Sequence, residues 1–116
     1  MDKPQPIKER AYRYSVEIVQ FLDSLPHDIT SQIIIKQLLR SATSVAANII
    51  EGQAASSRKE FSSFYQYALK SANESLYWLE LLRDTKKIFN ERLKYLLEET
   101  QQIAKILGAS VVKLKT

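Results

Sequence analysis

The sequence predicts an all-α protein, an antiparallel up-down-up-down four-helix bundle formed as a single domain over residues 1–116. Composition is the first reason. The chain contains only 2 glycines and 3 prolines, and it is rich in Leu, Ala, Glu, Lys and Gln, which form helices readily. Periodicity is the second reason, because apolar residues recur every three or four positions in four long segments. A chain of this length has one core.

Four amphipathic segments define the expected helices. Their apolar stripes give the ranges 7–25, 30–51, 57–84 and 90–113. Pro26 ends the first segment because proline lacks the backbone N–H and obstructs a helix interior. Connections of about three to six residues join the segments, and such short connections favour antiparallel neighbours.

Signals for starting and stopping a helix surround the second and third segments. Asp28 or Thr30 is the expected N-cap of the second helix, since a short side-chain oxygen accepts a hydrogen bond from a free backbone N–H. Gly52 is expected to end that helix in a left-handed conformation, where glycine has no Cβ to clash. Ser57 and Glu60 form the pattern of a capping box at the start of the third helix.

The residues that support catalysis or metal binding are scarce. The chain has no cysteine and a single histidine, His27, so thiolate or imidazole metal sites are not expected. Two isolated glycines cannot form a phosphate-binding loop. Glu60 is explained by capping, and Glu51 can pair with a basic group such as Arg40. The sequence therefore predicts that the protein is not an enzyme, with no catalytic residues, no metal and no cofactor.

The chain also lacks the sequence features of a membrane protein. Residues 1–6 are polar rather than the apolar core of a signal peptide, and no run of 18 apolar residues occurs. We therefore expect a soluble, cytoplasmic protein without a membrane partner.

Basic residues are the strongest functional signal. The formal net charge is +4, and Lys and Arg can neutralise phosphates while nearby aromatic rings stack on bases. The alternative to nucleic-acid binding is that these cations only keep the surface soluble, because lysines and arginines populate every solvated helix face. The first-ranked candidates for nucleic-acid binding are Arg83, Lys86, Lys87, Arg92 and Lys94. The second-ranked candidates are Arg58, Lys59, Lys105 and Lys113.

A row of apolar residues lies beside the core stripe of the third helix. It includes Tyr67, Trp78 and Leu81. The row either widens the core of the monomer or forms the interface of an oligomer, where aromatic residues are enriched and charges depleted. We favour a homo-oligomer.

Three motifs carry a family resemblance. They are QLLRSATSVAANIIEG at 37–52, SRKEF at 57–61 and SANE at 71–74. This pattern resembles the bacterial four-helix-bundle proteins encoded in intervening sequences of large-subunit ribosomal RNA genes, which were once labelled ribosomal proteins. The matching positions are Arg40, Ser44, Asn48, Glu51, Gly52, Ser57, Glu60, Phe61, Ser71 and Glu74.

The resemblance implies an assembly and a set of partners. Proteins of this kind form a ring, typically a pentamer, and are similar to the accessory protein of diversity-generating retroelements. There a basic barrel engages RNA and a reverse transcriptase. The family has no established enzymatic activity.

The matched polar residues are expected to form a buried structural network. Its members are Arg40, Ser44, Asn48, Glu51, Ser71 and Glu74, spaced about one turn apart on adjoining helices. Such a network selects one helix register and one oligomer.

The sequence thus predicts a non-enzymatic homo-oligomer that binds structured nucleic acid, RNA rather than DNA, through basic surface residues. The alternative is a protein-binding scaffold, such as an accessory subunit of a retroelement reverse transcriptase, that uses the aromatic row.

Overall fold

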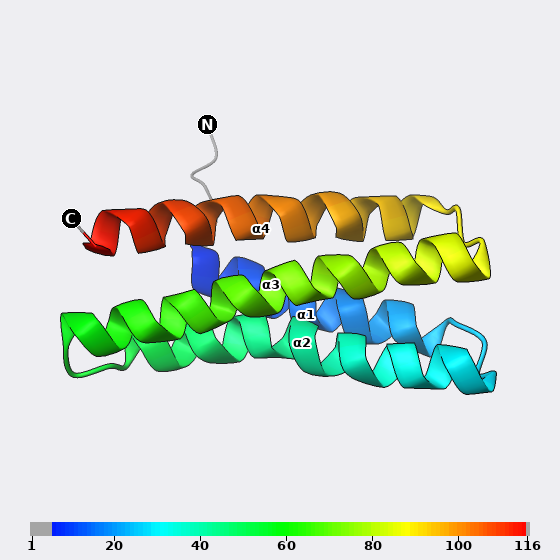
Figure 1. The fold of residues 1–116 in the computed structure, drawn as a ribbon, viewed down its shortest axis with the longest axis horizontal. Coiled ribbons are helices and arrows are strands. Elements are labelled where there is room, and N and C mark those ends of the chain that lie inside the picture. Colours follow the sequence, from blue (N-terminus) through cyan, green and yellow to red (C-terminus); the bar gives the residue numbers. More distant parts are fainter. Residues whose placement is uncertain (1–5, 116) are drawn as a thin grey trace.

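Four helices account for nearly all of the described residues. The structure is a computed structural model that describes the backbone of residues 6–115 and the side chains of residues 6–114. The helices are α1 (Ile7–Asp23), α2 (Ile29–Gln53), α3 (Arg58–Lys86) and α4 (Glu91–Lys115). They lie side by side with successive helices antiparallel, and the described residues contain no strand (Figure 1). The predicted all-α class is confirmed, and each expected helix end lies within two residues of the observed one.

The helices pack in the cyclic order α1, α2, α3, α4. The contacts between α2 and α3 are the most extensive, those between α3 and α4 follow, and α1 closes the bundle with fewer contacts to α4. At 17 residues α1 is shorter than the 25 residues of α4. The last turns of α4 therefore extend beyond the start of α1 (Figure 1).

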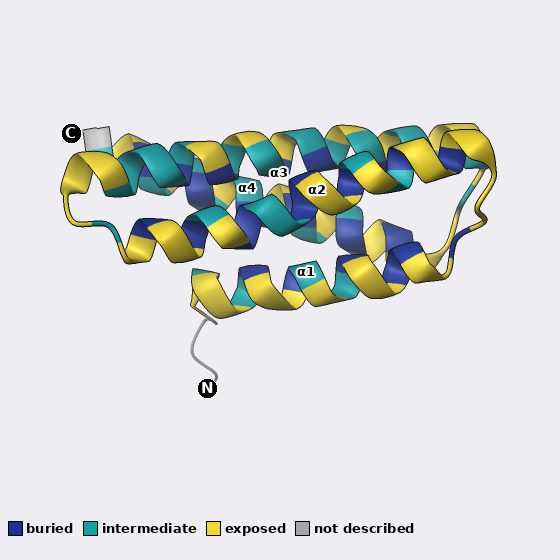
Figure 2. Ribbon diagram, turned by 90° about the horizontal axis from the view of Figure 1, so that it is seen from below, coloured by how far each residue is buried: buried dark blue, intermediate teal, exposed yellow. Residues whose placement is uncertain are grey.

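A single apolar core runs along the bundle axis, with each helix burying one stripe (Figure 2). Within it, the Tyr14 hydroxyl of α1 meets the Thr100 hydroxyl of α4 at 2.7 Å. Burial raises the pKa of Tyr14 to about 12, because a phenolate would be poorly solvated there. Closer to the surface, Arg10 binds both carboxylate oxygens of Glu99 at 2.8 and 2.7 Å and joins α1 to α4.

Gly52 does not end α2 in the way the sequence suggested. The helix continues through Gln53, and neither glycine has a positive φ. A Cβ at Gly52 would lie 3.0 Å from Tyr65 Cδ1 and 3.1 Å from Phe64 Cβ. The missing side chain therefore permits close approach of α2 and α3. The left-handed residue of the fold is Lys87, with φ 53°, at the end of α3.

Short polar side chains cap the helices. Asp28 caps α2 by accepting from the Ser31 N–H at 3.3 Å, as one of the two expected options. The Ser57 hydroxyl accepts from the Glu60 N–H at 3.1 Å. The reciprocal half of the expected capping box is replaced, because the Glu60 carboxylate accepts from the Ser56 hydroxyl at 3.3 Å instead.

Candidate nucleic-acid interface

The corner between α3 and α4 carries the first predicted set of cations. Lys87 ends α3 in its left-handed conformation, and the Asn90 side chain caps α4 by accepting from the Leu93 N–H at 2.8 Å. These two residues turn the chain sharply, so that Arg83 and Lys94 line the same cavity of about 300 Å³. The corner therefore gathers the five residues 83, 86, 87, 92 and 94 at one end of the bundle.

Two of those five cations are already paired. Arg83 Nε lies 2.8 Å from Asp84 Oδ1, a contact that raises the pKa of Arg83 and lowers that of Asp84. Lys86 Nζ lies 2.9 Å from Asp28 Oδ2 and lowers the pKa of that carboxyl. A phosphate would have to compete with these carboxylates for Arg83 and Lys86.

The other three corner cations are exposed. Lys87, Arg92 and Lys94 make no ion pair with any other described residue. Glu91 lies beside them in the first turn of α4, where a negative charge is favoured by the helix dipole. The corner thus offers three cations that are available for a phosphate, but acidic side chains lie close to them.

The second predicted set lies at the opposite end of the bundle. There the start of α3 meets the end of α4, and a groove of about 530 Å³ is lined by Arg58, Lys59, Ser62, Ser63, Gln66 and Leu114. The Arg58 guanidinium donates to the carbonyl oxygens of Lys113 and Leu114 at 3.4 Å, which satisfies free carbonyls at the end of α4. Lys59, Lys105 and Lys113 are exposed.

The charge of the molecule is unevenly distributed along its long axis. The hydrogen bonds Ser71–Ser44, at 3.1 Å, and Tyr14–Thr100, at 2.7 Å, mark the middle of the bundle. Among the described residues on one side of this level (7–14, 45–70 and 102–114), eight Lys or Arg face three Glu, a net charge of +5. The other half (15–44 and 71–101) has seven cations and nine acids, a net of −2.

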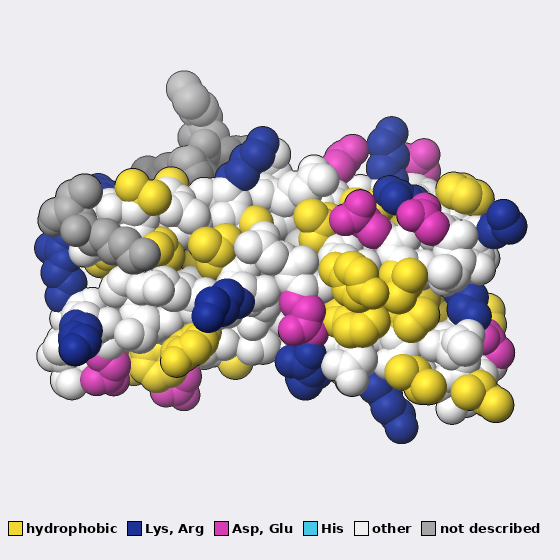
Figure 3. Space-filling model, in the orientation of Figure 1, with side chains coloured by type: hydrophobic (Ala, Val, Ile, Leu, Met, Phe, Trp, Pro, Cys, Tyr) yellow, Lys and Arg dark blue, Asp and Glu magenta, His cyan; other side chains and the backbone are white. Residues whose placement is uncertain are grey.

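On the face shown in Figure 3, most acidic side chains accordingly gather over the half that contains the α3–α4 corner. We name the other half the basic end; its cations are Lys8, Arg13, Arg58, Lys59, Lys70, Lys105 and Lys113, together with Arg10, which is paired with Glu99 of the acidic half. As candidates for nucleic-acid binding, the sequence analysis ranked the corner residues first and Arg58, Lys59, Lys105 and Lys113 of the basic end second. Once folded, the basic end holds the greater excess of positive charge, because residues distant in sequence converge there.

The predicted polar network lies in part between α2 and α3. The Asn48 amide donates to the Ser44 carbonyl and hydroxyl at 2.8 and 2.9 Å, and the Ser71 hydroxyl donates to the Ser44 hydroxyl. Arg40 pairs with Glu74 at the surface. Glu51 is exposed and joins none of these contacts among the described residues.

Two serines outside the predicted set of residues extend this network. The Ser75 hydroxyl donates to the Ser41 hydroxyl at 3.0 Å in a fully buried position. Their small size, like that of Gly52, lets α2 and α3 approach closely. Their spacing of one turn from Ser44 and Ser71 was the signal that could have revealed them.

The aromatic row of α3 is only partly exposed. Tyr67 is 55 % exposed, whereas Trp78 and Leu81 pack against the core and are half-buried. Trp78 donates its indole N–H to Glu74 at 2.9 Å. Trp78 and Leu81 therefore widen the core, as one of the two readings expected, and the oligomer interface stays a prediction.

Among the described residues, no three His, Asp or Glu side chains come close enough to hold a metal ion. The acids with a shifted pKa, Asp28 and Asp84, are exposed partners of Lys86 and Arg83 rather than members of a cleft.

Comparison with known proteins places this architecture in a family. A solved protein of unknown function from the S23 ribosomal protein family of Bacteroides thetaiotaomicron is 34 % identical, with a TM-score of 0.81. The match covers 91 % of this chain and 98 % of that chain. No functionally curated protein matches the sequence. The family model described as 23S rRNA-intervening sequence protein matches residues 4–109. The resemblance seen in the motifs is thus confirmed, and the chain belongs to the 23S rRNA-intervening sequence protein family.

Proposed function

We propose that this protein is a non-enzymatic homo-oligomer that binds structured RNA through basic surface residues. The observation that carries the proposal is the +5 charge of the basic end. Such a concentration of charge favours a polyanion over a small neutral ligand. The family's association with ribosomal RNA genes supports RNA as the polyanion.

Available cations at the basic end come from three helices. Lys8 of α1, Lys59 of α3 and Lys105 of α4 are all exposed and make no ion pair with another described residue. Phosphate contacts from separate helices can follow a folded RNA backbone without reading its bases. The corner cations Lys87, Arg92 and Lys94 would provide a second, weaker contact beside the acidic half.

Two variants with the same loss of charge test this proposal. One replaces Lys8, Lys59 and Lys105 by Gln, and the other replaces the three corner cations by Gln. RNA affinity is measured against salt concentration by fluorescence anisotropy. We expect the basic-end variant to bind more weakly, with a salt slope shallower by about 0.7–0.9 per lost phosphate contact. The matched corner variant should change less.

The outcomes separate the possible locations of the interface. A loss confined to the corner variant would move the interface to the corner that the sequence ranked first. If wild-type protein fails to bind structured RNA at low salt, or if neither variant changes the salt slope, the proposed RNA-binding function is wrong.

A further inference from the structure

An aromatic ring lies exposed at the corner between α3 and α4. The Phe89 side chain is 78 % exposed, whereas the other phenylalanines, Phe21, Phe61 and Phe64, are buried or half-buried. Phe89 makes no ring contact with another described aromatic residue. Its neighbour Ile88 packs against the core, which anchors the connection and leaves the phenyl ring at the surface. The packing of the described residues therefore gives no reason for an aromatic ring at this position.

Phe89 borders the cavity of about 300 Å³ between the end of α3 and the start of α4. Two apolar side chains of α4, Leu93 and Leu97, also line this cavity. Its polar lining residues are Arg83, Asn90, Glu91 and Lys94. A concave apolar surface with a few polar groups is the usual form of a small-ligand site. The volume lies at the small end of the range for such sites, which suits one planar ring system rather than a larger ligand.

Asn90 has a free hydrogen-bond donor at this cavity. Its Oδ1 accepts from the Leu93 N–H at 2.8 Å, which holds the side chain in place. No described residue accepts from its Nδ2. The carboxylate of Glu91 likewise makes no ion pair with another described residue. The cavity therefore offers a donor and an acceptor together, and the edge of an unpaired nucleobase presents the complementary groups.

The charges around the cavity favour a base over a bare phosphate. A phosphate seated inside it would be repelled by the carboxylate of Glu91. Lys87 and Lys94 are exposed and make no ion pair with another described residue, so they can contact phosphates outside the cavity. A nucleotide in a single strand combines a flat ring with flanking phosphates, which matches one aromatic ring beside two lysines.

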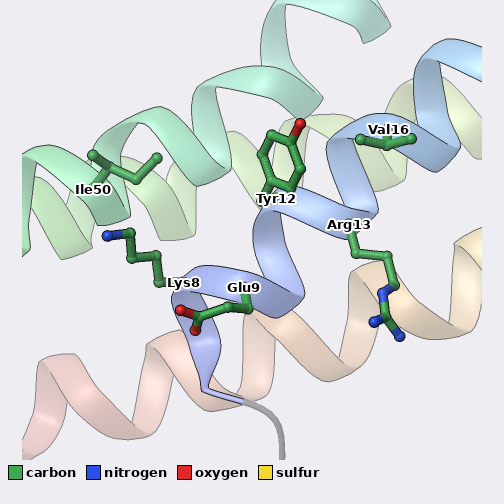
Figure 4. A pocket seen from close by; sticks show the side chains of 6 residues that line it. All are labelled: Lys8, Glu9, Tyr12, Arg13, Val16 and Ile50. Carbon is green, nitrogen blue, oxygen red and sulfur yellow. The ribbon is translucent and has the colours of Figure 1, made fainter.

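Another exposed ring bordered by cations, Tyr12 of α1, lacks this combination. Tyr12 is 63 % exposed and lines a groove of about 470 Å³ with Lys8, Arg13 and Ile50. Lys8 and Arg13 extend in different directions on either side of Tyr12 (Figure 4), so they do not converge on one phosphate. The wall contributed by α2 is apolar, and the length and composition of α2 would even suit a membrane span. Among the residues that line this groove, none has an amide side chain like that of Asn90.

We infer that the α3–α4 corner binds one unpaired nucleotide of an RNA, with its base stacked on Phe89. The edge of the base meets Asn90 and Glu91. Lys87 and Lys94 hold the adjoining phosphates. The inference rests on the proposed RNA binding and names what the corner recognises. Because a duplex keeps its bases stacked and paired, the corner selects bulges, loops and ends rather than continuous helices.

Stacking also explains how a corner in the acidic half can contribute to RNA binding. The described residues of that half have a net charge of −2, which disfavours a contact made through phosphates alone. Stacking of a base on a phenyl ring releases no counterions, so the gain that it provides should not depend on salt. The basic end then supplies salt-dependent affinity for any RNA, and the corner adds a preference for RNA with an unpaired base.

Three RNAs with the same paired strands test the inference. The first is a blunt duplex, the second contains one bulged adenosine, and the third has an abasic nucleotide in place of that adenosine. The second and third carry the same charge and differ only in the base. Fluorescence anisotropy measures the Kd of each RNA at several salt concentrations. We expect wild type to bind the adenosine bulge about fivefold to tenfold more tightly than the abasic bulge, the lower part of the range for stacking one base. This ratio should stay constant as salt rises.

Three single substitutions locate the stacking contact. Phe89→Leu removes the aromatic face at an exposed position, so circular dichroism should show unchanged helicity, and the ratio should fall to about one because stacking is lost. Phe89→Trp keeps an aromatic face and should keep the preference for the adenosine bulge. Tyr12→Leu is the matched control, since it removes another exposed ring beside two cations, and it should leave the wild-type ratio unchanged.

The outcomes separate this inference from the proposed function. The inference is overturned if wild type binds the adenosine and abasic bulges equally, if Phe89→Leu retains the preference, or if either Phe89→Trp or Tyr12→Leu loses it. Equal binding of all three RNAs with a steep salt dependence would remove only the nucleotide site and leave RNA binding in place. A wild-type protein that binds none of the three RNAs at low salt would overturn the proposed function, and the inference with it.

Discussion

The two glycines of this chain provide a test of how closely α2 and α3 pack. Both lie inside helices, at Gly52 and Gly108, and replacing glycine by alanine in a helix gains about 1 kcal/mol from backbone propensity. At Gly108 an added Cβ would meet nothing within 4 Å. We therefore expect Gly108→Ala to stabilise the fold by about 1 kcal/mol.

At Gly52 the same substitution meets the neighbouring helix. The new Cβ would lie 3.0 Å from Tyr65 Cδ1 and 3.1 Å from Phe64 Cβ. Tyr65 can rotate slightly, but the Phe64 Cβ moves only with the backbone of α3. Overpacking of this kind costs about 1–3 kcal/mol, which offsets or exceeds the gain in propensity. Gly52→Ala should thus be less stable than Gly108→Ala by about 1–3 kcal/mol.

Chemical denaturation at one fixed protein concentration measures the difference, since association would otherwise shift the midpoint. A difference of this size corresponds to roughly 4 °C in melting temperature per kcal/mol for a domain of this size. Equal stabilisation by the two substitutions would refute close approach as the reason for glycine at position 52.

The remaining predictions concern the core and the first connection. Tyr14→Phe should lower the free energy of unfolding by about 1 kcal/mol near pH 7, and a double-mutant cycle with Thr100→Val should show coupling between the hydroxyls. Because the pKa of Tyr14 is raised to about 12 in the folded state from an ordinary 10.0, unfolding at alkaline pH should become easier as pH rises from 10 to 12, and Tyr14→Phe should reduce that loss. The pKa of Asp28 is lowered by Lys86, so its contribution is full above its ordinary value of 3.8 and is lost as pH falls below it; Lys86→Gln should flatten the acid side of the stability profile.

Much of the fold is encoded locally and could be predicted from the sequence. The period of apolar residues set the four helices, and Pro26 with the Asp28 and Ser57 caps located their connections. Gly52 was misread because a glycine near a helix end looks the same whether it adopts a positive φ or admits a neighbouring helix. Only the position of Tyr65 distinguishes the two.

The candidate site was harder to predict because charges and apolar surfaces combine across helices. The local sequence showed a basic segment around residue 87, but not that Asp28 would pair with Lys86 from the first connection. The exposed apolar residues of α1 did have a signal in the sequence, since Tyr12, Val16 and Val19 repeat at four- and three-residue intervals outside the core stripe. Which helix would lie beside that second stripe depended on the packing.

The unequal charge of the two halves gives the bundle an electric dipole along its long axis. With the described residues contributing +5 in one half and −2 in the other, the molecule experiences a torque in the field of a polyanion before any atoms touch. Collisions would then be pre-oriented, positive tip leading, and added salt would act first on the rate of encounter rather than on the lifetime of the complex.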